Sequence, residues 1–384
     1  MQQICLLGAS GSIGLQTIDV MRKNPKDFTL VGFSIGKKIK KINAILKFFP
    51  SIKYICVQNK KDYDYLINKY PNINFYYGDE GLISLIDYCK PTMVVNALVG
   101  FVGLKPSLFT LEKNLILALA NKETLVVGGE LINNLLDQGK GELYPIDSEH
   151  VALRKCLSVE DKKVKNLYLT ASGGAFRNLS RNQLKNVKAS DALKHPTWKM
   201  GKKITIDCAT MVNKTFEIIE AYQLFHYPYS KLKIMLHDES YIHSYVEYTD
   251  GTLRLDEGKP DMRIPIEYAL YRGLVPFKTI TTDRLTSLSK YHFHNFDIKR
   301  YPIVSLAKKV IKEQGLLGAI FNASNEVAVN AFLLDQIAFL DIEKIIHKCM
   351  KHFENIAHPT YEDILLIDRS TREYATSLIN EVRL

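Results

Sequence analysis

Short apolar runs alternate with segments of helical periodicity along the first 146 residues. The apolar runs predict six strands, at Gln3–Leu7, Thr29–Ser34, Tyr54–Cys56, Met93–Asn96, Leu115–Leu119 and Glu142–Pro145. Apolar residues recur at helical spacing over Ile13–Lys23 and Ile39–Phe49. Strands that alternate with helices are typical of a parallel sheet with helices on both faces. We therefore expect an α/β fold that begins with a doubly wound parallel sheet.

The pattern changes near residue 147, where strands mix with loops rich in His, Trp, Gly and Pro. Three strands are predicted there, at Leu167–Thr170, Ile234–His237 and Tyr245–Tyr248. Residues 283–303 have no clear periodicity and predict a linker. Four helices are predicted after it, at Ala307–Gln314, Ser324–Gln336, Asp341–His352 and Tyr361–Val382. The expected domains are therefore 1–146, an α+β domain at 147–282 and a C-terminal helical bundle at 304–384.

Composition fits a soluble protein of a reducing compartment. The six cysteines are scattered without a CxxC pair, which argues against both a disulfide framework and a zinc site. The sequence as written shows no signal peptide and no apolar run near the roughly 20 residues that span a bilayer. We expect a cytoplasmic protein without a membrane partner.

The formal net charge of +10 raises the question of nucleic-acid binding. The densest basic run, Lys37–Lys41, has no interleaved aromatic residues of the kind that stack on bases. Lysine is abundant along the whole chain, so we do not expect a nucleic-acid partner. A positive field could still attract an anionic substrate.

A glycine-rich segment, Gly8–Gly14, follows the first strand and opens the first helix. Glycines there let the backbone approach a pyrophosphate, and the helix N-terminus supplies amide donors. The spacing is GxxGxxG rather than GxGxxG, so a tight turn without a ligand is the alternative. In this context we favour a Rossmann-like nucleotide site.

The end of the second strand indicates which nucleotide. An NAD site usually has an acid there, whereas a 2′-phosphate requires cations. Here the strand continues into Gly36, Lys37 and Lys38 without an acid. The sequence therefore favours NADP.

Polar residues follow later strands of the same sheet, at Asn96–Gly100 and at Asn121, Lys122 and Glu123. In an open parallel sheet the ligand crevice lies outside the carboxyl ends of the strands. A surface ion pair between Lys122 and Glu123 is an equally good interpretation from the sequence alone.

Two carboxylates stand two residues apart at Asp147 and Glu149. In an extended chain they would project side by side, and a hard dication such as Mg²⁺ or Mn²⁺ would relieve their repulsion. The alternative is two solvated acids at a strand end. His150 would point to the opposite face, so we expect a supporting role for it rather than a ligand role.

A second polar cluster lies on a helix predicted over Val212–Tyr222. Asn213 and Glu217 are four residues apart and share a face, and Lys214 can converge on Glu217. An amide, an ammonium and a carboxylate on one face suit a phosphate beside a metal. An amphipathic surface helix is the alternative.

Two loops complete the candidate site. Ser172, Gly173 and Gly174 follow a strand and offer a hydroxyl and close-approach amides to an anion. The segment His195–Gly201 holds the only tryptophan, Trp198, among polar residues, Pro and Gly. It predicts a lid that excludes water from a bound substrate, or else a Trp that anchors a loop to the core.

Taken together, these segments resemble the 1-deoxy-D-xylulose 5-phosphate reductoisomerase family. The matching segments run in order along nearly the whole chain: Gly8–Gly14, Gly36-Lys37, Asn121–Glu123, Asp147–His150, Ser172–Gly174, His195–Gly201, Asn213-Lys214 with Glu217, Pro260–Arg263 and Asn322–Ala328. The resemblance implies conversion of that substrate to 2-C-methyl-D-erythritol 4-phosphate, by rearrangement and then hydride transfer from NADPH. It also implies a homodimer joined through the middle domain.

The resemblance assigns roles to individual residues. The residues implied for NADPH are Gly8, Ser10, Gly11, Ser12, Ile13, Gly36, Lys37, Lys38, Asn121, Glu123 and Gly201. The metal ligands would be Asp147, Glu149 and Glu217. The substrate would contact Lys122, Ser148, Glu149, Ser172, His195, Trp198, Met200, Cys208, Asn213, Lys214 and Glu217, with Lys122, Glu149 and His195 as catalytic residues.

The chain departs from the family pattern at a few positions. Cys208 replaces a usual Ser in the phosphate-binding segment, and a thiol is the weaker hydrogen-bond donor. Thr215 and Phe216 replace a usual Gly-Leu, Ala175 replaces a Pro, and Ser10 replaces a Thr. None of these changes removes an expected metal ligand.

Two other functions are compatible with parts of the sequence. Cys208 could be the nucleophile of a thiol-dependent aldehyde dehydrogenase on a two-domain nucleotide-binding fold. An NADP-binding sensor without chemistry would need none of the three carboxylates. A requirement for a divalent cation separates the reductoisomerase from both.

Overall fold

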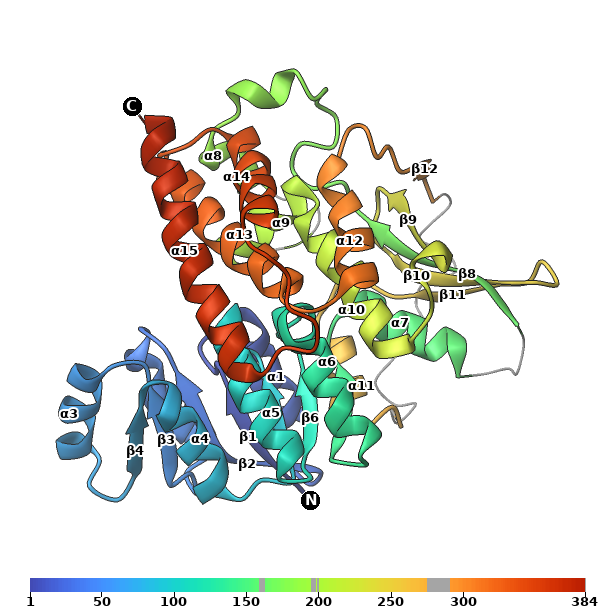
Figure 1. Ribbon diagram of the computed structural model, residues 1–384. Coiled ribbons are helices and arrows are strands. Elements are labelled where there is room, and N and C mark those ends of the chain that lie inside the picture. The colour runs from blue at the N-terminus through green and yellow to red at the C-terminus, as the bar shows by residue number, and fades with distance from the viewer. Residues whose placement is uncertain (159–162, 195–197, 199, 275–290, 384) are drawn as a thin grey trace. The chain divides into compact units, whose positions relative to one another are not determined.

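The computed structural model describes residues 1–158, 163–194, 198, 200–274 and 291–383 (Figure 1). These residues form two compact units. The first contains Met1–Thr124, Leu131–Asp147 and the stretch from Met262 to the gap that follows. The second contains Leu125–Glu130, Ser148–Asp261 and the described residues from Tyr291 onward.

A seven-stranded, wholly parallel sheet forms the centre of the first unit, in the order β4-β3-β2-β1-β5-β6-β7. The strands are β1 (Gln2–Leu7), β2 (Phe28–Ile35), β3 (Tyr54–Val57), β4 (Asn74–Tyr77), β5 (Met93–Asn96), β6 (Ile116–Leu119) and β7 (Glu142–Pro145). The six predicted strands are confirmed within two residues at each end. The sequence pattern missed β4, a four-residue edge strand with only Phe75 buried.

Successive side chains of β1 enter two different apolar clusters. Ile4 and Leu6 pack in one cluster with Phe33 and Met21, whereas Cys5 and Leu7 pack in another. Because successive strand residues point to opposite faces, the sheet is buried on both sides. The expected doubly wound, Rossmann-like architecture is confirmed.

Helices alternate with these strands along the chain. They are α1 (Ser12–Lys23), η1 (Ile39–Lys41), α2 (Ile42–Phe48), α3 (Lys60–Lys69), α4 (Gly78–Cys89), η2 (Phe101–Gly103), α5 (Leu104–Glu112) and α6 (Glu123–Asp137). The strand order reverses between β1 and β5, and ligands of such sheets bind where the order reverses. The Gly8–Gly14 turn follows β1 at this point.

A helix from later in the chain, α11 (Arg263–Leu270), completes the first unit. Its buried residues Ile266, Ala269 and Leu270 belong to the apolar cluster of Ile4. The Tyr271 ring also meets Phe28 edge to face at 4.9 Å. The expected 147–282 domain includes this segment, but its apolar face draws it into the core of the nucleotide unit.

The second unit contains a mixed five-stranded sheet in the order β11-β10-β8-β9-β12. The strands are β8 (Val164–Ala171), β9 (Leu232–His237), β10 (Ile242–Tyr248), β11 (Leu253–Glu257) and β12 (Phe293–Asn295). Among these described strands, β8 and β9 pair in parallel and the other neighbours pair antiparallel. The β12 strand falls inside the expected linker, where its backbone pairs with β9 although its side chains show no strand pattern. Residues 283–290 of that linker lie outside the described residues.

The helices of the second unit fall into an earlier and a later set. The earlier set is α7 (Ser148–Leu157), η3 (Gln183–Asn186), α8 (Ala189–Ala192), α9 (Lys202–Thr210), α10 (Val212–Phe225) and η4 (Tyr229–Lys231). The later set is η6 (Pro302–Val304), α12 (Ser305–Glu313), α13 (Leu317–Leu333), α14 (Phe339–His352) and α15 (Tyr361–Arg383). All four predicted C-terminal helices are present, in orange and red in Figure 1.

The helix α13 begins seven residues before its predicted start at Ser324. Its first turns are buried on every side, so their sequence shows no amphipathic periodicity. Among the described residues, no helix combines the length and the apolar character needed to cross a membrane.

Candidate active site

The turn after β1 depends on glycine at two positions. Gly8 has φ +85°, and a Cβ added to it would lie 2.5 Å from the carbonyl oxygen of Ala97. A Cβ on Gly14 would lie 2.3 Å from the carbonyl oxygen of Gly8. The closeness of these contacts fits a turn that brings backbone amides against a pyrophosphate. The exposed Gly11 and Ser12 leave the start of α1 open to solvent.

The end of β2 supports this turn and presents cations. The Ser34 hydroxyl accepts a hydrogen bond from the Gly8 amide at 2.9 Å, and the Ser34 carbonyl accepts one from Ala9 at 2.9 Å. Lys37 and Lys38, just beyond the strand, are both exposed. Two exposed ammonium groups just after β2 suit the 2′-phosphate of NADP.

Asn121 is fully engaged in holding two loops together. Its side-chain amide donates to the carbonyl oxygens of Leu98 and Gly100 at 3.1 and 3.0 Å. Its oxygen accepts hydrogen bonds from the Thr124 amide and hydroxyl. The backbone N–H of Asn121 also donates to the Asn96 carbonyl oxygen at 3.2 Å, and the contact of Asn121 with a cofactor stays a prediction.

Lys122 forms a short, buried ion pair with Asp147. The ammonium nitrogen lies 2.6 Å from Oδ2, and both side chains are about nine-tenths buried (11% and 10% exposed). Glu123 is also buried and accepts from the Asn121 amide at 3.2 Å. The alternative of a surface Lys122–Glu123 pair does not fit, because both residues are buried.

Asp147 and Glu149 do not lie on an extended chain as expected. The helix α7 begins at Ser148, so Asp147 directly precedes the helix and Glu149 lies in its first turn. Acidic side chains are favoured at a helix N-terminus because the helix dipole is positive there. The Ser148 hydroxyl donates to Glu149 Oε2 at 2.6 Å.

The helix α10 brings three polar side chains together, as its spacing predicts. The Asn213 amide donates to Glu217 Oε1 at 2.6 Å. The Lys214 ammonium lies 3.1 Å from Glu149 Oε1 and also forms an ion pair with Glu217. Lys214 and Glu217 are buried, which excludes the alternative of a surface helix.

One carboxylate oxygen each from Asp147, Glu149 and Glu217 lies within 4.8 Å of the others. Asp147 ends the first unit but is bonded to Ser148, so the chain itself holds it at the start of α7. Three hard oxygen donors at this separation fit an octahedral dication such as Mg²⁺ or Mn²⁺. The donor set therefore suits the expected metal.

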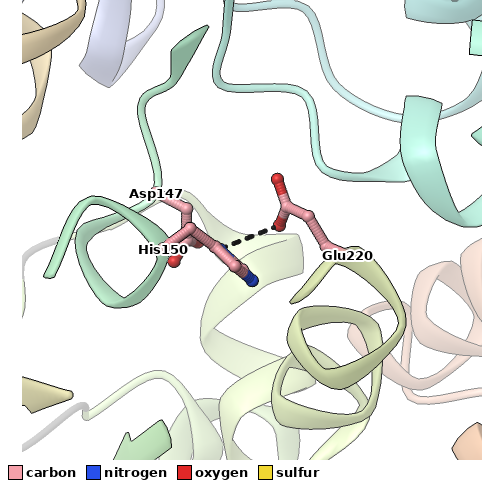
Figure 2. A group of neighbouring side chains, drawn as sticks. All are labelled: Asp147, His150 and Glu220. Carbon is pink, nitrogen blue, oxygen red and sulfur yellow. Dashed lines mark ion pairs between the residues drawn. The ribbon is translucent and has the colours of Figure 1, made fainter. Parts of the chain in front are cut away.

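Figure 2 shows His150 and Glu220 beside Asp147, with the His150–Glu220 ion pair dashed. His150 is completely buried; its Nδ1 lies 3.3 Å from Glu220, and its Nε2 lies 2.9 Å from the carbonyl oxygen of Glu217. The ring thus contacts the backbone of an expected ligand, which agrees with a supporting role. Sequence reasoning missed Glu220: its spacing from Glu217 predicts only that the two residues lie one turn apart on one helix, and only the structure brings Glu220 to His150.

The Ser172–Gly174 loop has the form of an anion cradle. Gly173 and Gly174 have φ of +81° and +67°, and the Gly174 amide donates to the Ser172 hydroxyl at 3.2 Å. A Cβ on Gly174 would lie 2.7 Å from the carbonyl oxygen of Cys208. The loop therefore packs tightly on the end of α9, which carries the half-buried Cys208.

Two departures from the family pattern are absorbed by the core. The Thr215 hydroxyl donates to the carbonyl oxygen of Met211 at 2.8 Å. The Phe216 ring meets Phe321 edge to face at 4.9 Å. Neither side chain takes the place of Asn213 or Lys214 on the polar face of α10.

Part of the expected lid, including His195, lies outside the described residues. Trp198 and Met200 are half-buried, and Gly201 is exposed directly before α9. The Trp198 ring centroid lies 6.1 Å from that of His243 on β10. Sequence reasoning did not identify His243, which no motif distinguishes.

Family models cover most of the chain. A model described as 1-deoxy-D-xylulose 5-phosphate reductoisomerase matches residues 4–129, and a model of the C-terminal domain of that enzyme matches residues 143–225. A third, described as the DXP reductoisomerase C-terminal domain, matches residues 258–374. A curated 1-deoxy-D-xylulose 5-phosphate reductoisomerase 2 of Bacillus thuringiensis is 44% identical over 382 residues, which cover 99% of this chain and 100% of the relative.

The chain belongs to the 1-deoxy-D-xylulose 5-phosphate reductoisomerase family. A further family member, from Geobacillus, is 42% identical over 99% of this chain and 100% of its own. The Zymomonas mobilis reductoisomerase in complex with NADPH is 34% identical and superposes with a TM-score of 0.89, covering 98% of this chain and 99% of that one. A DOX-P reductoisomerase in complex with NADPH, fosmidomycin and magnesium gives a TM-score of 0.93 at 32% identity, covering 99% and 98%. Membership of this family disfavours the thiol-dependent dehydrogenase.

Proposed function

We propose that this chain converts 1-deoxy-D-xylulose 5-phosphate to 2-C-methyl-D-erythritol 4-phosphate with NADPH and Mg²⁺ or Mn²⁺. The observation that carries the proposal is the group of three converging carboxylates, Asp147, Glu149 and Glu217, in a chain of this family. A simple nucleotide-binding sensor would have no use for three buried or half-buried acids at one point, because such acids repel one another.

The three carboxylates would hold the dication, which when bound polarises the substrate carbonyl and keeps the reacting oxygens in register. Glu149 and Glu217 are already steered toward one another by Lys214. Lys122, paired with Asp147, places an ammonium where it can hold a proton beside a reacting oxygen. With His195 from the lid, Lys122 and Glu149 are the proposed catalytic residues.

The cofactor would lie along the ends of β1 and β2. The proposed contacts are Gly8, Ser10, Gly11, Ser12 and Ile13 for the pyrophosphate, Gly36, Lys37 and Lys38 for the 2′-phosphate, and Asn121, Glu123 and Gly201 elsewhere. NADPH supplies the hydride of the reduction when bound. The chain's own contribution is to present backbone donors and two exposed ammonium groups to an anionic ligand.

The substrate phosphate would bind to Ser172, Asn213 and Lys214, with Cys208 and Ser148 beside them. Contacts to a phosphate that does not react orient the rest of the substrate and lower the barrier through positioning. Trp198 and Met200 would close over the substrate and exclude water. These roles follow the matching positions of the family.

The proposal extends to assembly and compartment. We infer a homodimer joined through the 147–282 region, and a cytoplasmic enzyme. The support for the compartment is that all six cysteines are free thiols, five of them buried.

The test is oxidation of NADPH, followed by absorbance, on addition of 1-deoxy-D-xylulose 5-phosphate. Chelation of divalent cations should abolish it, and Mg²⁺ or Mn²⁺ should restore it. Glu149→Gln should also abolish NADPH oxidation, and added Mg²⁺ or Mn²⁺ should not restore it. The affinity for NADPH should be unchanged. Full activity of either the chelated enzyme or Glu149→Gln would overturn the metal assignment. Activity lost to a thiol reagent but not to chelator would instead favour the dehydrogenase.

A further inference from the structure

The buried pair of His150 and Glu220 has no role in the proposed reaction. The side chains are 0% and 1% exposed, and the ring of His150 also stacks on Phe225 at 6.4 Å between centroids. Burial of a carboxylate next to an imidazole carries a desolvation cost, and an apolar pair of similar size would stabilise a core at least as well. The pair therefore calls for an explanation other than stability.

The contacts of the ring connect two helices that each carry an expected metal ligand. His150 directly follows Glu149 in the first turn of α7. Its Nε2 reaches the backbone carbonyl of Glu217 on α10, and its Nδ1 reaches the Glu220 carboxylate one turn further along α10. Figure 2 shows Glu220 approaching the ring from this helix.

We propose that Glu220 is a positioning residue for the metal site. It orients the His150 ring so that Nε2 binds the Glu217 carbonyl, and this bond sets the separation of Glu149 and Glu217. Glu220 touches no reacting group itself. The inference rests on the proposed function in one respect, namely that Glu149 and Glu217 hold the dication.

The hydrogen-bonding capacity of the ring predicts which replacement is tolerated. A glutamine at position 220 can donate its amide N–H to Nδ1 of a neutral ring, which then carries its proton on Nε2 and donates it to the Glu217 carbonyl. A methionine fills similar space but offers no comparable hydrogen bond. Glu220→Gln should therefore preserve the orientation that Glu220→Met and Glu220→Ala remove.

The test is the dissociation constant of Mn²⁺, measured by electron paramagnetic resonance of free Mn²⁺ on the full chain without substrate. Loss of a partner behind the ligands typically weakens metal binding about 10- to 100-fold, and we expect this loss for Glu220→Ala and Glu220→Met. Glu220→Gln should stay within about threefold of the parent, because its amide N–H can donate to Nδ1 and hold the same ring orientation. Asp368→Asn, which breaks the ion pair of Asp368 and Arg372 on α15, is the matched control and should leave Mn²⁺ affinity unchanged.

An unchanged far-ultraviolet circular dichroism spectrum, to which the helices of both units contribute, would show that each variant is folded. A folded Glu220→Met with parental Mn²⁺ affinity would overturn the proposal, whether or not Glu220→Ala folds. Equal losses in Glu220→Gln and Glu220→Met would also overturn it, since charge rather than orientation would then be responsible. Failure of the proposed function has a different signature: Glu149→Gln would then bind Mn²⁺ like the parent.

Discussion

The nucleotide turn and the carboxylate cluster depend on different properties of the chain. At Gly8–Gly14 the function depends on backbone geometry, because a side chain at Gly14 would collide with the Gly8 carbonyl. At the start of α7 and on α10 it depends on charged side chains, which pair with Lys214. A substitution in the turn should therefore act by changing backbone geometry, and a substitution in the carboxylate cluster by changing charge.

Glu217→Gln should have the largest effect. It keeps the size of the side chain but removes one negative charge from the metal site, so we expect kcat to fall about a thousandfold, equivalent to ~4 kcal/mol. NADPH affinity should stay as in the parent. The control is Glu247→Gln, which breaks a more exposed pair with Lys165 on the sheet. A kcat of Glu217→Gln within tenfold of the parent value would contradict the proposed dependence of the carboxylate cluster on charge.

Gly14→Ala should damage the other region alone. Its Cβ would lie 2.3 Å from the Gly8 oxygen, so the turn must shift. Overpacking typically costs about 1–3 kcal/mol, and we expect NADPH affinity to fall about 10- to 100-fold while Mn²⁺ affinity is unchanged. Gly139→Asn is the control, because Gly139 has φ +73° with no heavy atom within 4 Å of the added Cβ, and Asn tolerates that conformation. Equal NADPH affinity in both variants would exclude the turn from cofactor binding.

Lys37→Ala combined with Lys38→Ala should sharpen the nucleotide assignment. Loss of two cations from the 2′-phosphate should raise the KM for NADPH about tenfold and leave that for NADH nearly unchanged. Steady-state kinetics with both cofactors measures the ratio. Lys40→Ala removes an exposed lysine of the same basic run and should leave the KM for both cofactors unchanged. An equal rise for both cofactors would show that these lysines do not read the 2′-phosphate.

Cys208→Ser should have the smallest effect. A hydroxyl is a better donor than a thiol, so the KM for the substrate should stay the same or fall. The measurement is the KM for 1-deoxy-D-xylulose 5-phosphate at saturating NADPH. A large loss of kcat would instead give the thiol a role of its own.

The sequence predicts the nucleotide unit better than the carboxylate site because its signals are local. Each of these signals is formed by neighbouring residues: the glycine turn, each of the six apolar strands and the lysines after β2. The unit nevertheless recruits α11, and nothing in Arg263–Leu270 indicates that its apolar face packs beside Phe28. The order of the strands also shows only in the structure.

The carboxylate site depends on residues that lie far apart in the chain. Glu149 and Lys214 are 65 residues apart, and helical spacing predicts only the partners within α10. The extended reading of Asp147 and Glu149 was wrong, because a Ser-Glu-His start favours a helix N-terminus as readily as a strand end. Tertiary contacts alone reveal the placement of Glu220 against His150.

The most direct test of the account is diffraction from crystals of the full chain grown with Mn²⁺, recorded at the manganese absorption edge. The account predicts one anomalous peak bounded by carboxylate oxygens of Asp147, Glu149 and Glu217, and its loss in Glu217→Gln. A peak bound by other residues, or one that persists unchanged in Glu217→Gln, would contradict it.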